Sequence, residues 1–162
     1  LEGNYTFKQG EKYQIEISGE KRYVDSLKVN TSHSVLTLKN HMPICSSSVP
    51  FEIVVTVPQL QHISILRESQ VKIDDFTDQE ELTIDLTDNS QLEIGTLTGL
   101  KRLSIAMSQN ASIKSIQQFS PLDELSVNIE GNGHFNGYTI PAKNVSITIE
   151  GKATVKLTQL KN

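Results

Sequence analysis

The densest group of side chains that could do chemistry is an acidic run spanning residues 74–81. Carboxylate oxygens suit Ca²⁺, a hard cation that takes about six to eight oxygen ligands. The run lacks the glycine and the ligand spacing of a calcium-binding loop. We therefore interpret it as a solvated acidic turn and predict no metal site, with Asp74, Asp75 and Asp78 as weak calcium candidates.

Two carboxylate pairs, Asp123 with Glu124 and Asp85 with Asp88, raise the question of glycosidase or polysaccharide-lyase chemistry. Glycoside hydrolysis requires two carboxylates that face each other across a sugar, one of them with a raised pKa. Carboxylates that point outward from a flat surface remain hydrated, so burial does not raise the pKa of either one. Lyase chemistry also needs a nearby basic residue, and nothing in the sequence places one there. We predict no catalytic residues.

The remaining metal and nucleophile candidates are isolated. The histidines at 33, 41, 62 and 134 are scattered, and Cys45 is the single cysteine. His41 with Cys45 would supply two of the three or four protein ligands that zinc takes. Cys45 has no histidine and acid arrangement in the sequence that would activate it. We therefore expect no cofactor.

Composition bounds the class of protein. The 162 residues suit one domain, and Ile, Val and Leu dominate a hydrophobic fraction of 36%, as in a core of stacked strands. The net charge is −4 and no basic run is longer than Lys21-Arg22, which excludes a nucleic-acid footprint. No stretch reaches the roughly 20 apolar residues of a membrane helix. The single cysteine rules out an intrachain disulfide, and the oligomeric state stays open.

The first 50 residues alternate apolar and polar side chains with the period of half-buried strands. Strands are predicted at 5–7, 13–17, 27–29 and 35–38, with a hairpin turn at 9–11 joining the first two and a helical turn near 21–25. Residues 41–50 contain two prolines and three serines and are predicted to form a surface loop.

From residue 51 the sequence repeats. Five segments align on a small or polar hinge residue, at intervals of 21, 21, 22 and 20 residues: Ser69, Ser90, Ala111, Gly133 and Ala153. Aliphatic residues alternate on both sides of each hinge, so each repeat carries two strands. Leucine-rich repeats have a similar period, but they need a helical segment in each repeat. We therefore predict an all-β fold, a β-solenoid of about 20 residues per rung with aliphatic side chains pointing inward.

The same alignment gives an outward row on the first strand of each rung. Its members are small and hydroxylated: Thr83, Ser104, Ser126 and Ser146. We take these four as candidate binding residues. On the second strand Glu93 is predicted to lie beside Lys114. At the corners, glycine admits the left-handed backbone, and we expect Asn89 and Asn110 to adopt it in the rungs without glycine.

The strand, corner and strand pattern, with the corners Gly131-Asn132-Gly133 and Gly151-Lys152-Ala153 and the segment 53–60, resembles the auto-transporter adhesin head GIN domain family. The resemblance covers nearly the whole chain. It implies a right-handed parallel β-helix, a bacterial periplasmic, outer-membrane-associated or secreted location after loss of a targeting segment, and an adhesin role. It supplies no catalytic residues.

We expect one domain, with residues 1–50 capping a solenoid formed by 51–162. The leading functional prediction is a non-enzymatic surface-binding module whose partner is a protein or glycan at the cell surface. A structural or assembly component of the envelope is the alternative, and a polysaccharide-active enzyme ranks third.

Overall fold

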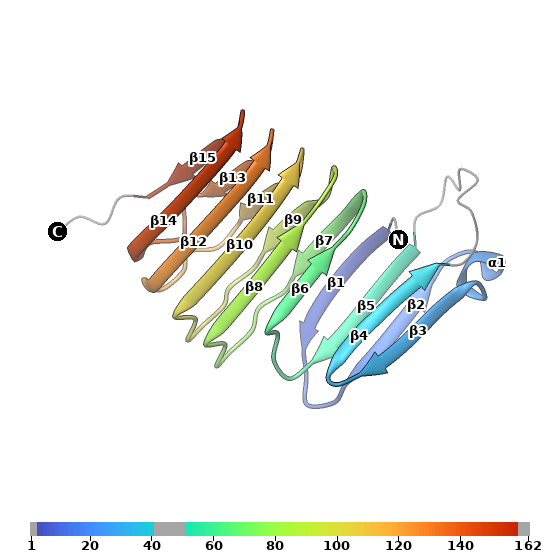
Figure 1. Cartoon of the computed structure of the whole chain (residues 1–162). Coiled ribbons are helices and arrows are strands. Elements are labelled where there is room, and N and C mark those ends of the chain that lie inside the picture. Colours follow the sequence, from blue (N-terminus) through green and yellow to red (C-terminus); the bar gives the residue numbers. More distant parts are fainter. Residues whose placement is uncertain (1–2, 41–50, 159–162) are drawn as a thin grey trace.

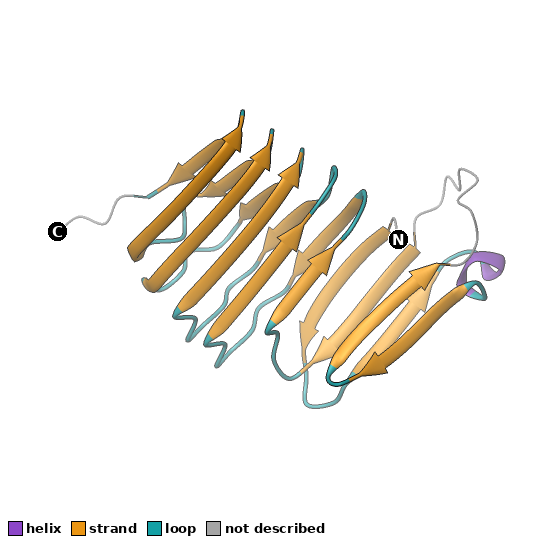
Figure 2. Ribbon diagram, in the orientation of Figure 1, coloured by secondary structure: helices purple, strands orange, loops and turns teal. Residues whose placement is uncertain are grey.

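The computed structural model describes residues 3–40 and 51–158, so the predicted loop at 41–50 lies outside the described residues. Two sheets face each other across a continuous core, and their strands stack along one axis (Figures 1 and 2). One sheet has five parallel strands in the order β14 (Ala142–Gly151), β12 (Leu122–Gly131), β10 (Arg102–Gln109), β8 (Glu81–Leu86) and β6 (His62–Ile65).

The other sheet has eight strands. Their order is β15 (Thr154–Leu157), β13 (His134–Gly137), β11 (Ser112–Ser115), β9 (Gln91–Ile94), β7 (Ser69–Ile73), β1 (Gly3–Gln9), β5 (Phe51–Val57) and β2 (Gln14–Ser18). From β6 to β15 successive strands alternate between the two sheets, so each rung contributes one strand to each sheet. The prediction of an all-β solenoid is confirmed.

Strand register follows the predicted alignment of the repeats. One inward row of the five-stranded sheet is aligned through all five rungs: Ile63, Ile84, Ile105, Val127 and Ile147. The first four of these side chains are at most 4% exposed. The hinge residues Ser69, Ser90 and Ala111 are also buried. The inward and outward assignment from sequence alternation is therefore correct. On the second sheet Glu93 pairs with Lys114 as predicted.

The third side of the coil is closed by a row of large side chains outside the regular strands: Phe76, Leu97, Phe119 and Ile140. Each is at most 4% exposed. Phe76 and Leu97 form a parallel bridge, with the Phe76 amide 2.9 Å from the Thr96 carbonyl oxygen. The same contact recurs two rungs later, where the Phe119 amide donates to the Thr139 carbonyl at 3.0 Å.

The prediction that Asn89 and Asn110 adopt the left-handed backbone is wrong. The left-handed residue lies one position earlier in every rung: Arg67, Asp88, Gln109, Gly131 and Gly151 have φ of 80°, 61°, 59°, 101° and 123°. The asparagines stack instead. Asn110 Nδ2 donates to Asn89 Oδ1 at 3.0 Å, and Asn132 Nδ2 donates to Asn110 Oδ1 at 3.2 Å. A carboxamide ladder thus bridges three corners.

The predicted hairpin at 9–11 is also wrong, because β1 and β2 are not neighbours. β5 lies between them, parallel to β1 and antiparallel to β2. β1 pairs on its other side with β7. The first strand therefore extends the parallel stack, since its apolar residues Tyr5 and Phe7 pack against the solenoid core. The helical turn α1 (Lys21–Val24) is confirmed, and β3 (Leu27–Ser32) pairs antiparallel with β4 (Val35–Asn40).

Candidate binding face

The outer face of the five-stranded sheet carries the predicted hydroxyl row, which we call the hydroxyl ladder. Direct pairing connects its members in order: Thr83, Ser104, Ser126 and Ser146. Thr83 is half-buried and the three serines are exposed. His62 continues the row on β6, opposite Thr83. The structure thus brings all four sequence candidates together on one face.

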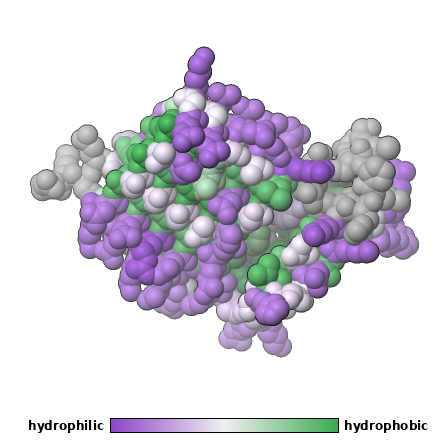
Figure 3. Space-filling model, viewed as in Figure 1, coloured by the Kyte–Doolittle hydropathy of each residue, from purple (hydrophilic) through white to green (hydrophobic). Residues whose placement is uncertain are grey.

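Parallel pairing gives this face a regular spacing. Neighbouring rungs lie about 4.8 Å apart, and outward residues along one strand repeat about every 6.6 Å. A second outward row runs beside the ladder: Ser64, Asp85, Ala106, Asn128 and Thr148. In Figure 3 much of the front surface over these strands is near-neutral, with strongly hydrophilic residues around it. These two rows form a lattice of mostly short side chains, and a third outward row beside the ladder carries the longer Glu81, Arg102 and Glu124.

One margin of this face carries charges that alternate in sign along the solenoid axis. Lys101 Nζ lies 3.0 Å from Glu80 Oε1, and Lys143 Nζ lies 2.7 Å from Asp123 Oδ1. The hydrogen bond and charge of Lys143 lower the pKa of Asp123, with a further contribution from Lys101. The Lys101 ammonium likewise lowers the pKa of Glu80. These exposed pairs orient the corner more than they stabilise it.

Sequence reasoning missed this charged margin. The residues at 80, 101, 123 and 143 recur at the repeat interval and alternate in sign, which is the signal that could have found it. The sequence presents Asp123 only as half of a carboxylate pair with Glu124. In the structure it faces Lys143 rather than a second acid. A carboxylate held by an exposed ammonium lacks the raised pKa that a general acid needs.

The other candidate chemistry is dispersed. Asp74 Oδ1 lies 2.8 Å from Lys72 Nζ, and Asp75 Oδ1 accepts a hydrogen bond from the Thr96 amide at 2.7 Å. Within residues 3–40 and 51–158, no cluster of three or more His, Cys, Asp or Glu side chains could hold a metal ion. The Asp85 Oδ2 atom accepts a hydrogen bond from His62 Nε2 at 2.7 Å. The pair His41 and Cys45 lies outside the described residues.

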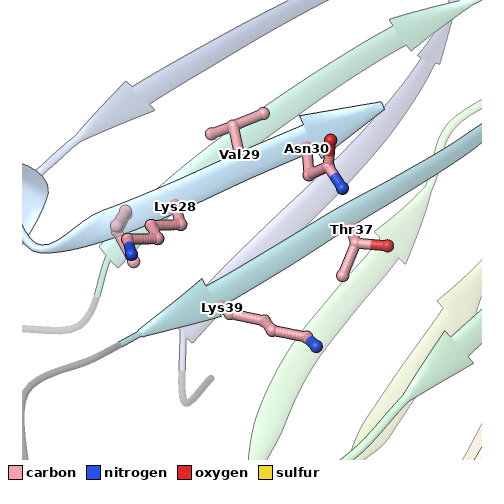
Figure 4. A pocket seen from close by; sticks show the side chains of 6 residues that line it. Lys28, Val29, Asn30, Thr37 and Lys39 are labelled. Atoms are coloured by element: carbon pink, nitrogen blue, oxygen red, sulfur yellow. The ribbon is translucent and has the colours of Figure 1, made fainter. Parts of the chain in front are cut away.

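A hollow of about 670 Å³ lies beside the β3–β4 hairpin. Its lining comes from both strands, with two apolar and four polar side chains: Leu27, Lys28, Val29, Asn30, Thr37 and Lys39. Figure 4 shows the Lys28 and Lys39 ammonium groups on separate strands, well apart from each other. The hollow opens to solvent, and its lining holds no carboxylate or imidazole that could activate Thr37 or either lysine as a nucleophile.

Comparison with known families identifies the chain. The family described as "putative auto-transporter adhesin, head GIN domain" matches residues 2–162. The chain belongs to this family. No protein of curated function matches this head GIN domain chain. Within the described part, none of the helical structure is long and apolar enough to cross a membrane.

Two solved structures share the fold. A crystal structure of a putative adhesin from Bacteroides fragilis NCTC 9343 aligns over 97% of this chain and 88% of its own, with 16% identity and a TM-score of 0.60. A putative lipid binding protein from Parabacteroides distasonis ATCC 8503 aligns over 99% of this chain and 90% of its own, with 10% identity and a TM-score of 0.56. At these identities the similarity establishes the fold alone.

Proposed function

We propose that this head GIN domain is a non-enzymatic, surface-exposed or secreted binding module, and that the hydroxyl ladder is its contact surface. The observation that supports this most directly is the unbroken alignment of Thr83, Ser104, Ser126 and Ser146 across four rungs. The family description and the adhesin from B. fragilis point to the same general role.

Physical chemistry favours this face over the opposite one. One outward row of the eight-stranded sheet carries long charged side chains, including Lys72, Glu93, Lys114 and Lys156, whereas the long charged residues of the ladder's own face lie in the row beside the ladder. Immobilising a lysine or glutamate costs up to about 2 kcal/mol of side-chain entropy, whereas short hydroxyl side chains lose much less. A serine hydroxyl also both donates and accepts hydrogen bonds. Binding of a flat partner at the hydroxyl ladder therefore costs less side-chain entropy than binding at the charged row.

The contact would be the sum of many weak interactions. Each neutral hydrogen bond contributes about 1 kcal/mol or less net, so one hydroxyl alone holds nothing. A rigid row of hydroxyls presents them all at once, which suits an extended protein or glycan with its own repeat. Apart from the His62 imidazole, the outer rows of β6 to β14 described above have no aromatic ring for stacking on a sugar.

The test compares two quadruple variants on coated beads. In the first, Thr83, Ser104, Ser126 and Ser146 become lysine. In the matched control, four residues of a second outward row on the eight-stranded sheet become lysine: Gln70, Gln91, Ser112 and Thr154. Bead attachment to mucin-coated and fibronectin-coated surfaces is counted under flow, with circular dichroism verifying both folds.

We expect attachment of the native domain to at least one of these surfaces, at least tenfold reduced by the first variant and retained by the control. Equal attachment of both folded variants would contradict the ladder as the contact surface. Vesicles of phosphatidylethanolamine and phosphatidylglycerol form a third arm. Binding to vesicles alone would replace the adhesion proposal with a lipid-binding one.

A further inference from the structure

The last rung of the solenoid leaves its aliphatic side chains partly uncovered. Val145, Ile147 and Ile149 belong to inward rows, yet they are 46%, 41% and 44% exposed. Their counterparts one rung earlier are at most 1% exposed. β14 and β15 are terminal strands of their sheets, and no other strand of the described residues pairs with their outer edges. Among the described residues, the core of the solenoid is therefore open at this end.

The backbone groups at this edge have a definite direction. The Thr83 amide donates to the Gln61 carbonyl of the preceding rung at 2.9 Å. Thr83 aligns through the ladder with Ser146, so Ser146 directs its amide to β12 in the same way. Successive residues of a strand point their backbone groups to opposite sides. Val145, Ile147 and Ile149 therefore direct their N–H and C=O groups to the open edge.

From this end we infer that two copies of the chain associate end to end about a twofold axis, pairing β14 antiparallel with β14 and β15 with β15. An isologous contact of this kind closes after two copies. An exposed edge strand is a ready template for such pairing. The second copy would cover the uncovered aliphatic residues with their own equivalents.

The sequence of β14 is complementary to itself in one register. With the axis at Ile147, Ile147 faces its own copy and Val145 faces Ile149. On the outer face Ser146 then meets Thr148, and the Asn144 carboxamide meets the Glu150 carboxylate. Shifting the axis by one residue places Ile149 against Lys143 or Val145 against Gly151, and either change loses an apolar contact.

The same axis also suits β15. In the preceding rung, a Cβ on Gly133 would lie 2.6 Å from Ile129 Cγ2, so these two positions face each other across the core. Counting two residues along each strand places Phe135 opposite Val127, and one rung later Val155 opposite Ile147. An axis through Ile147 therefore passes Val155, where Val155 meets itself and Ala153 meets Leu157. A single twofold axis therefore pairs the edge of β14 and the edge of β15 with their own copies.

The contact is small. β14 is about 33 Å long, and two packed sheets with their side chains are about 20 Å thick, so each copy would contribute on the order of 600 Å². The combined buried area of the two copies is near the lower limit for specific protein interfaces. We therefore expect a micromolar dissociation constant. The twofold axis keeps the hydroxyl ladder of both copies on one side, so pairing would double its length. The inference does not depend on what that ladder binds.

Sedimentation equilibrium of the 162-residue chain from about 1 to 500 μM tests the association, because that range spans a micromolar dissociation constant. We expect a mass that rises to twice 18.0 kDa and no further. Ile147→Lys places two ammonium groups together at the axis and should weaken association at least tenfold. Val29→Lys alters a residue of similar exposure, 45%, on β3 and should leave the dimer intact.

Residue-resolved hydrogen exchange on the native chain needs no variant. In the dimer the amides of Val145, Ile147 and Ile149 should become protected as concentration rises, while those of Ser146 and Thr148 stay protected throughout. A mass that stays at one copy over the whole range would overturn the inference. So would a dimer that survives Ile147→Lys, or one in which the Ile147 amide exchanges freely, since either would place the contact elsewhere.

Discussion

The side-chain carboxamide of Gln79 brackets the backbone of Leu60 in the core. Gln79 Oε1 accepts a hydrogen bond from the Leu60 amide at 3.0 Å, and Nε2 donates to the Leu60 carbonyl oxygen. Gln79 is 3% exposed and occupies the row that Leu100 and Leu122 fill in later rungs. It completes the backbone pairing of a corner where the first rung is irregular.

Replacing Gln79 by leucine should therefore destabilise the domain, although leucine is the residue used at the same place in other rungs. Two buried backbone groups of Leu60 would lose their partners, at a cost of about 1 to 3 kcal/mol each. Chemical denaturation measures the change. Gln59→Leu is the control, because Gln59 is exposed and its amide makes one bond of 3.3 Å to the Asp78 carbonyl. Equal stability of the two variants would contradict the bracketing role.

Aspartate at an inward position should unfold the protein, and aspartate next to it should be tolerated. Ile105 is 1% exposed, and an unpaired carboxylate there costs several kcal/mol against a total stability of about 5 to 15 kcal/mol. Ser104 points to solvent on the same strand. Thermal melts followed by circular dichroism compare Ile105→Asp with Ser104→Asp. Similar melting temperatures would show that the face assignment is in error.

The left-handed corner position should discriminate sharply between glycine and alanine. Gly131 has φ of 101°, and an added Cβ would lie 3.0 Å from the Gln109 carbonyl oxygen. The left-handed backbone alone costs a non-glycine residue about 1 to 2 kcal/mol, so Gly131→Ala should lower the free energy of unfolding by at least that much. Gln109→Gly, one rung earlier with φ of 59°, should change it by less than about 1 kcal/mol. A harmless Gly131→Ala would contradict the conformation at this corner.

The phenol of Tyr5 should lose its proton at an unusually high pH. Burial raises the pKa of Tyr5 from 10.0 to about 12, because the core disfavours the phenolate. The neutral form is the one that the fold favours. This contribution to stability is therefore complete below pH 10 and is lost as pH rises through 10 towards 12.

Ultraviolet absorbance of phenolate should show a step near pH 12 in the folded chain, and Tyr5→Phe should remove that step. A native, folded chain whose absorbance above pH 10 is the same with and without Tyr5→Phe would contradict burial of the Tyr5 hydroxyl.

Calcium should leave the melting temperature unchanged between chelator and millimolar Ca²⁺. The Asp74 carboxylate already pairs with Lys72, and that of Asp75 with the Thr96 amide, so the two do not converge on one ion. Differential scanning fluorimetry provides the measurement. A rise of several degrees that disappears when Asp74, Asp75 and Asp78 all become asparagine would establish a calcium site in the acidic turn.

The solenoid and the direction of its side chains could be predicted from the sequence. Alternation about the hinges from Ser69 to Ala153 predicted which residues point inward, because each strand is buried on one side only and the repeat places equivalent positions above one another. The hydroxyl ladder followed from the same alignment. Both depend on the local alternation of apolar and polar residues, which is repeated in every rung.

The irregular features depend on contacts that form only when the chain is folded. The turn at Gly10 was compatible with a hairpin, but β1 gains two parallel neighbours by entering the stack beside β5 and β7. Gln79 reads as a polar residue of an acidic turn until Leu60 is brought against it. The exposure of Ile147 depends on what lies beyond the last rung rather than on its own pattern. Contacts between residues distant in the chain set these three outcomes, and no local periodicity encodes them.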